Sequence, residues 1–205
     1  MTLTWLIVRA SGLVAYGLLA AASIWGLLLS NRLLGRTVQA RALTLTHEGL
    51  SLGALAALGT HLGFVAADAY LGFGWRDLTI PGAASWHPQA TALGVVAAWG
   101  ILIVTLSFYV RRFIGQKAWR SLHFGAFGMY AAATAHGIMA GSDTRHPAVL
   151  ALYLGSAAAV VVLVVARVAL AGEKARSATA RAPARPVRPN QVAVGAGMEA
   201  VPAEN

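Results

Sequence analysis

Five long apolar stretches, separated by short polar connections, dominate the hydrophobic pattern of the chain. Each reaches about 20 residues or more, the length that an α-helix needs to cross a hydrocarbon core of about 30 Å. Only helices satisfy all their own backbone groups in lipid without closing a barrel. The pattern therefore predicts an all-α, polytopic membrane helix bundle with about five transmembrane helices. The stretches run roughly over Thr4 to Leu29, Leu43 to Gly72, Thr91 to Val110, Trp119 to Ala140 and Ala148 to Leu170.

The composition agrees with a membrane protein. Of the 205 residues, 58% are hydrophobic and only 11% are charged, and the mean hydropathy is +0.64. Soluble domains carry about 25% charged residues. A lipid bilayer is therefore the expected surrounding of the chain.

The positive charges predict the orientation. Thirteen of the sixteen Lys and Arg residues lie at the connections after the first and third stretches or toward the C-terminus, whereas Arg9, Arg76 and Arg145 lie on the opposite side. The positive-inside rule then places the N-terminus outside and the C-terminus in the cytoplasm, in a multi-pass protein of a plasma membrane such as a bacterial inner membrane. The asymmetry explains most of the net charge of +9, so nucleic acid is not an expected partner. The thirteen are Arg32, Arg36, Arg41, Arg111, Arg112, Lys117, Arg120, Arg167, Lys174, Arg176, Arg181, Arg185 and Arg188.

The composition changes near Gly172 to a segment rich in Ala, Arg, Pro and Gly. Such a segment buries too little apolar surface to offset its ordering entropy. We therefore expect a transmembrane bundle over residues 1–171 and a disordered, basic cytoplasmic tail over residues 172–205. A cleavable signal peptide ending near Ala20 to Ser23 is an alternative, but the apolar run is longer than such peptides have and Arg9 is its only basic residue. The absence of cysteine excludes disulfides, thiolate-held clusters and c-type haem attachment.

Four histidines inside the apolar stretches form the candidate site. His47 and His61 lie fourteen residues apart in the second stretch, and His123 and His136 lie thirteen apart in the fourth. At 1.5 Å per residue, the members of each pair are about 20 Å apart along a helix, so one metal ion cannot bridge them. Both stretches run from inside to outside. Depth therefore matches His47 with His123 near the inner surface and His61 with His136 near the outer surface.

Two imidazoles facing each other across a gap are what a six-coordinate haem b needs. The four histidines are therefore the predicted cofactor-binding residues and iron ligands of two haems, and no catalytic residue is assigned. On an ideal helix, residues fourteen apart, such as His47 and His61, point within about 40° of each other around the axis. Residues thirteen apart, such as His123 and His136, point about 140° apart. If His123 and His136 both bind haem, their helix should depart from ideal α geometry, for example by a π-bulge near its glycines. A buried, hydrogen-bonded side chain is the alternative for any single histidine.

The paired histidines, on two helices separated by one plain helix, resemble the ferric reductase-like transmembrane domain. This domain is shared by NADPH oxidases, ferric-chelate reductases and the membrane subunit of bacterial periplasmic methionine sulfoxide reductase systems. The similarity covers roughly Ala10 to Leu170 and includes the opening segment SGLVAYGLL. It implies a di-haem cytochrome b-like oxidoreductase component that carries electrons from a cytoplasmic-side donor to an outer-side acceptor, a protein or a small molecule.

The chain departs from the oxidases in having no glycine-rich phosphate loop after the last stretch, so we expect no flavin and NADPH module of its own. The electron donor could be a cytoplasmic flavin reductase or a membrane quinol, and the sequence does not choose between them. The rival hypotheses are a quinol-linked cytochrome b subunit and a non-haem membrane transporter or anchor protein.

Other polar residues have weaker expectations. His87 and His146 lie in outer loops, where histidines are mostly solvated. Glu48 is expected at the inner membrane edge, facing arginines or tuning the inner haem. Arg41 and Arg120 flank the inner histidines and could pair with haem propionates. Arg9 could meet Asp68 or steady the outer propionates.

Overall fold

The computed structural model describes residues 2–31 and 39–181. Within these residues every regular element is a helix, which confirms the predicted all-α class. The helices are α1 (Leu3–Ser30), α2 (Ala40–Ala67), α3 (Trp75–Thr79), α4 (Pro88–Ile114), α5 (Gln116–Phe124), α6 (Ala126–Ala140) and α7 (Pro147–Arg181).

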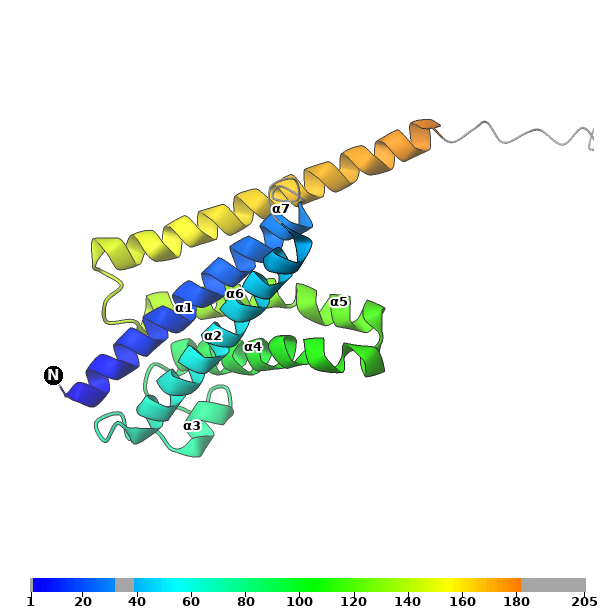
Figure 1. Cartoon of the computed structure of the whole chain (residues 1–205). Coiled ribbons are helices and arrows are strands. Elements are labelled where there is room, and N and C mark those ends of the chain that lie inside the picture. Colours follow the sequence, from blue (N-terminus) through cyan, green and yellow to red (C-terminus); the bar gives the residue numbers. More distant parts are fainter. Residues whose placement is uncertain (1, 32–38, 182–205) are drawn as a thin grey trace, which may run out of the picture. The chain divides into compact units, whose positions relative to one another are not determined.

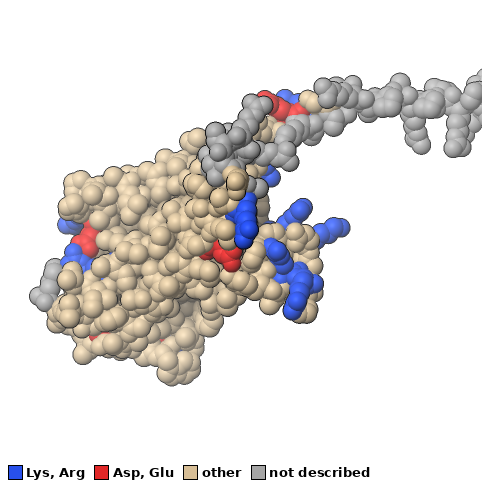
Figure 2. Space-filling model, in the orientation of Figure 1, with Lys and Arg blue, Asp and Glu red and all other residues tan. Residues whose placement is uncertain are grey.

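Four helices, α1, α2, α4 and α7, are long and apolar enough to cross a membrane. Their outward faces carry large apolar side chains, such as Ile103, which is 52% exposed, and Val165, which is 62% exposed. Figure 2 shows the same distribution, because the long flank of the molecule in view carries almost no charged side chain, while Lys and Arg gather at one end. This is the surface expected of a multi-pass membrane protein.

The fourth apolar stretch is divided into two helices instead of one. α5 and α6 meet at Gly125, and neither reaches 18 residues alone. Together they cover residues 116–140, about 37 Å of helix at 1.5 Å per residue. Glycine weakens a helix at this point because it lacks a side chain and costs about 1 kcal/mol relative to alanine. The departure from ideal geometry between His123 and His136 is a single turn residue: Gly125 keeps right-handed helical φ and ψ, −59° and −19°, and its N–H lies 3.3 Å from the carbonyl oxygen of Ser121.

Four helices pack as the corners of a ring. α1 packs against α2 and α6, and α4 packs against α6 and α2 (Figure 1). α2 and α6, which the structure describes over their whole lengths, have no Cα atoms within 8 Å of each other. The two helices that carry the four histidines, α2 and the α5–α6 pair, thus lie diagonally opposite, with α1 and α4 as the spacers between them.

A buried polar network joins α1, α6 and α7. The Tyr16 hydroxyl lies 3.2 Å from the Tyr130 hydroxyl and 2.8 Å from the Ser156 hydroxyl, and Tyr130 donates to Ser156 at 2.8 Å. Tyr153 packs edge-on against Tyr16 with the ring centroids 4.6 Å apart. These hydroxyls satisfy one another inside an apolar cluster, so the network fixes how the three helices meet.

The chain divides into two compact units between Leu170 and Ala171. Helix α7 continues past Gly172 to Arg181, so the first ten residues of the predicted tail are helical. The prediction of disorder for residues 182–205 lies outside the described residues.

Candidate cofactor site

Three of the four intramembrane histidines lie against a glycine on a neighbouring helix. The clearest case at the α1–α2 contact is His61. A Cβ atom placed on Gly12 would lie 3.0 Å from Nδ1 of His61, closer than ordinary van der Waals contact. Because Gly12 has no side chain, the imidazole can lie directly against the α1 backbone.

The same imidazole is held by a backbone carbonyl. Nδ1 of His61 lies 2.9 Å from the carbonyl oxygen of Val8, four residues before Gly12. A carbonyl can only accept, so Nδ1 carries the proton and donates it. In the neutral ring this leaves the lone pair on Nε2, which is the arrangement that metal-binding histidines usually have.

The arrangement is repeated at the α4–α6 contact with different residues. A Cβ atom on Gly94 would lie 2.6 Å from Nδ1 of His136, and that Nδ1 lies 2.7 Å from the carbonyl oxygen of Ala90. Ala90 is again four residues before the glycine. His136 therefore also presents Nε2 as its free nitrogen.

His47 and His123 are held less completely than His61 and His136. A Cβ atom on Gly26 would lie 3.1 Å from Cε1 of His47. The carbonyl of Ala22, four residues before Gly26, faces this ring, but the buried Nδ1 of His47 does not reach hydrogen-bonding geometry. His123 has no glycine against it among the glycines of the described residues, and it stacks instead on Trp119 at 5.2 Å.

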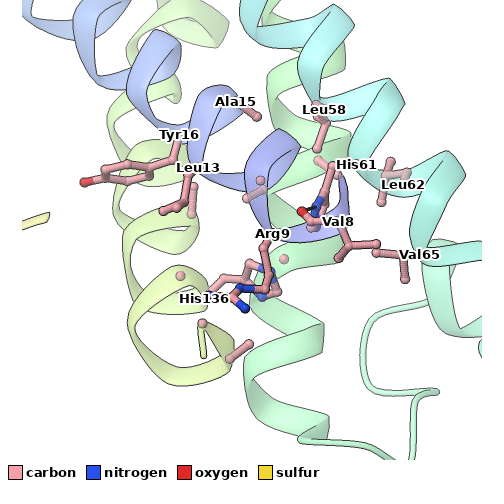
Figure 3. A pocket seen from close by; sticks show the side chains of 18 of the residues that line it. Val8, Arg9, Leu13, Ala15, Tyr16, Leu58, His61, Leu62, Val65 and His136 are labelled. Carbon is pink, nitrogen blue, oxygen red and sulfur yellow. Dashed lines mark hydrogen bonds between the residues drawn. The ribbon is translucent and has the colours of Figure 1, made fainter. Parts of the chain in front are cut away.

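The predicted pairing by depth agrees with the positions of the four rings. The ring centroids of His47 and His123 are 6.0 Å apart, with their planes at 73°. His61 and His136 line one apolar cavity of about 200 Å³ (Figure 3). The structure thus brings His47 to His123 and His61 to His136, and it places each pair across the diagonal of the bundle.

An ion pair lines this cavity. Arg9 donates from Nε to Asp143 at 2.7 Å, and its guanidinium also contacts the second carboxylate oxygen. Both residues line the cavity, and Figure 3 shows Arg9 extending from α1 on the side where His136 lies. Asp68 does not meet Arg9, because its carboxylate accepts the backbone N–H groups of Tyr70 and Leu71.

The remaining candidates lie away from the cavity. Glu48, in the first half of α2, accepts a hydrogen bond from Tyr109 at 2.8 Å, and no arginine contact of Glu48 is found in the part of the chain that the structure describes. His87 and His146 are exposed. Arg41 and Arg120 are also exposed.

The residues present were compared with the needs of a haem. Within the described ranges, no three His, Cys, Asp or Glu side chains gather as a metal-binding group, but an iron porphyrin asks for only two axial side chains. Two imidazoles on opposite sides of one metal, at about 2 Å per bond, have their ring centres about 6 Å apart. The 6.0 Å separation of His47 and His123 fits this value.

The cavity between His61 and His136 is smaller than a typical small-molecule site. Its volume of about 200 Å³ compares with roughly 300–1,000 Å³ for such sites. A porphyrin at the outer position therefore requires apolar side chains that line the cavity, such as Leu58 and Leu62, to change rotamer. The two imidazoles suit the group as ligands, and the cavity of about 200 Å³ must widen to admit it.

Comparison with known proteins gives no relative: no family model, no curated protein and no solved structure matches the chain.

Proposed function

We propose that the chain is a di-haem cytochrome b of a plasma membrane, with His47 and His123 as ligands of an inner haem and His61 and His136 as ligands of an outer haem. When bound, the two haems would supply one-electron transfer across the membrane, from a cytoplasmic-side donor to an outer-side acceptor. The chain is then the membrane component of an oxidoreductase.

The observation that carries the proposal is that His61 and His136 are held by the same two contacts. His61 and His136 belong to different helices, yet each lies on a glycine and donates Nδ1–H to the carbonyl four residues earlier. A histidine buried only for packing needs one hydrogen bond, and either ring nitrogen can make it. Two histidines with the same nitrogen bound and the other aimed into one apolar cavity are the arrangement expected of axial ligands.

The other residues of the bundle have supporting roles in this proposal. α1 and α4 hold α2 and α6 apart and so set the distance between facing imidazoles. The apolar lining excludes water, which favours outer-sphere transfer over side reactions. Arg9, already paired with Asp143 at the cavity, is placed to offset the charge of an outer propionate.

The direction of transfer follows from the proposed orientation. The N-terminus is outside and the cations near the α4–α5 junction, Arg111, Arg112, Lys117 and Arg120, are cytoplasmic. With the inside negative, moving one electron outward is favourable by about 2.3 kcal/mol per 100 mV. The exposed apolar flanks and the charged end in Figure 2 support this arrangement of five crossings, with α5 and α6 together making the fourth.

The partners in this proposal are a cytoplasmic flavin reductase or a membrane quinol as donor, and an acceptor protein or small molecule outside. The resemblance to the ferric reductase-like domain supports these partners; it rests on paired histidines, fourteen and thirteen residues apart, on two helices separated by one plain helix.

The first test is the haem content of detergent-purified protein from haem-replete cells, measured by the pyridine haemochrome assay with a dithionite-reduced minus oxidised spectrum. We expect about two b-type haems per chain. Replacing His47 or His123 should eliminate the low-spin signal of one haem, and replacing His61 or His136 that of the other.

The exposed loop histidines provide the matched controls. His87→Ala and His146→Ala should leave both low-spin signals unchanged. Folded protein without haem would refute the proposal and favour a non-haem transporter or anchor. Loss of the same signal in the His47 and His61 variants would refute the pairing.

A further inference from the structure

A cluster of cations lies where α4 ends and α5 begins. Arg111 and Arg112 belong to the last turn of α4, and Lys117 and Arg120 lie near the start of α5; all four side chains are exposed. We call these four residues the basic surface. Figure 2 shows Lys and Arg gathered at the end of the molecule where Figure 1 places the turn between α4 and α5. A partner for this surface must carry negative charge.

A tight turn brings the cations of the two helices together. Gly115, the single residue between α4 and α5, has a φ of +81°, a backbone conformation that favours glycine. Beyond the turn, Trp119 of α5 packs against Phe108 of α4, with the ring centroids 6.4 Å apart. The fold of both helices therefore sets the arrangement of the basic surface.

No carboxylate neutralises the basic surface. The sequence has no acidic residue between Asp77 and Asp143, and within the described ranges none of the four cations forms an ion pair. Glu48, which lies near α4, accepts its hydrogen bond from the hydroxyl of Tyr109 instead. The four positive charges are therefore available to a ligand.

Two of the guanidinium groups lie over aromatic rings. The Cζ atom of Arg111 is 4.0 Å from the centre of the Phe108 ring, and that of Arg112 is 4.5 Å from the centre of the Phe113 ring. A guanidinium stacked in this way keeps the N–H groups in its plane for an anion, and their geometry matches the oxygens of a phosphate.

Large apolar side chains are exposed beside the cations. Phe113 is 74% exposed and Phe124 is 73% exposed, and Ile114 and Leu122 are also exposed. The first two of these side chains would lose most from contact with water, and the acyl chains of a lipid can cover them. A phospholipid therefore matches both the apolar side chains and the cations, whereas an acidic soluble protein accounts for the charge alone.

We propose that the basic surface binds the headgroups of anionic phospholipids such as phosphatidylglycerol. Clusters of at least four Lys and Arg residues next to a membrane-spanning helix recognise such headgroups. In the proposed orientation these lipids belong to the cytoplasmic leaflet. The inference goes beyond electron transfer, and the binding does not require haem.

The test is energy transfer to lipid in full-length protein reconstituted in phosphatidylcholine nanodiscs. Because the chain has no cysteine, Ser121→Cys places one fluorescent donor on α5, and Ser85→Cys places it before the opposite end of α4. Both serines are exposed. Trace phosphatidylglycerol or phosphatidylcholine carries the acceptor on its acyl chain. Transfer at position 121 should favour phosphatidylglycerol by about fivefold or more, the factor expected for one cation near a charged surface.

Neutralisation of the basic surface is the decisive variant. In the Ser121→Cys background, the combined changes Arg111→Gln, Arg112→Gln, Lys117→Gln and Arg120→Gln should abolish the preference, and high salt should weaken it in the parent. Arg111→Lys with Arg112→Lys keeps the charge and should keep the preference. Arg145→Gln, at an exposed cation of another connection, is the matched control and should change nothing. A thermal melt of each variant verifies that it is folded.

Three outcomes would overturn the proposal. The first is an equal preference for phosphatidylglycerol at positions 121 and 85. The second is a preference that survives neutralisation of the basic surface but disappears in Arg185→Gln with Arg188→Gln, which would assign the lipid to the C-terminal segment. The third is no lipid preference together with salt-sensitive binding of an acidic protein to the basic surface. The haemochrome assay is independent, so either proposal can fail while the other stands.

Discussion

Gly94→Ala is the sharpest test of how the outer histidine is held. The added Cβ would lie 2.6 Å from Nδ1 and 2.7 Å from Cε1 of His136, whereas ordinary contact begins at 3.4 Å. The ring must therefore retreat by about 0.8 Å, the difference between 3.4 and 2.6 Å. The hydrogen bond from Nδ1 to Ala90, now 2.7 Å, would then stretch beyond the roughly 3.2 Å limit of a good bond.

The energies of this change can be compared. Losing the hydrogen bond costs about 1 kcal/mol and overpacking about 1–3 kcal/mol, while alanine in place of glycine returns about 1 kcal/mol of helix propensity. The net loss of stability is about 1–3 kcal/mol. Disturbing a residue that orients a metal ligand lowers metal affinity by roughly 10–100-fold. Gly94→Ala should therefore bind the outer haem that much more weakly.

The assay is a haem titration of the purified variant with a thermal melt alongside. Gly12→Ala should have a smaller effect at His61, because its Cβ would lie 3.0 Å away, and Gly17→Ala, with nothing within 4 Å, should have none. Any outer haem that Gly94→Ala retains should become reactive to carbon monoxide, since its ligand is dislodged. Full haem content with an unchanged spectrum in Gly94→Ala would refute the reasoning.

Three further predictions concern the rest of the bundle. Asp143→Asn removes a carboxylate partner of Arg9 and should lower the free energy of unfolding by about 1–3 kcal/mol, because the pair is partly buried; a melt in detergent measures this. Ser156→Ala removes the hydroxyl shared by two tyrosines and should cost about 1–2 kcal/mol in the same assay. Since the chain has no cysteine, Lys117→Cys should react with an impermeant thiol reagent only from the cytoplasmic side and Arg76→Cys only from outside.

Each of these predictions has an outcome that contradicts it. An unchanged melting temperature for Asp143→Asn would mean that the ion pair has no net effect on stability. For Ser156→Ala, a change smaller than that of Ser51→Ala, whose hydroxyl bonds only to the carbonyl of His47 in its own helix, would remove the stabilising role of the network. Labelling of Lys117→Cys from outside in intact cells would reverse the proposed orientation.

The helices were largely predictable from the sequence, because apolar length is a strong and local signal. The stretch with both His123 and His136 was the informative exception. Its thirteen-residue spacing conflicts with a straight helix, and the structure has a turn at Gly125 between the two histidines. Sequence reasoning could locate the conflict but not the kind of interruption, since glycine is compatible with several.

The contacts around the histidines were not predictable in the same way. Asp143 lies 134 residues from Arg9, and nothing local distinguishes it from Asp68 as the partner. Trp119 stacks on His123, a contact that depends on the rotamers of both side chains. Tyr16, Tyr130 and Ser156 meet only once three helices are packed. In each case the missing information was which helix faces which.

The pairing of glycine with histidine has a consequence for recognising relatives of this chain. α1 and α2 run antiparallel, so a later residue of α1 faces an earlier residue of α2. Gly12 faces His61 and Gly26 faces His47, and the fourteen-residue interval between the glycines equals that between the histidines. Two glycines on one apolar helix and two histidines on the next, with the same interval in each pair, form a pattern that a sequence search can use. The pattern depends on four positions and does not require overall sequence similarity.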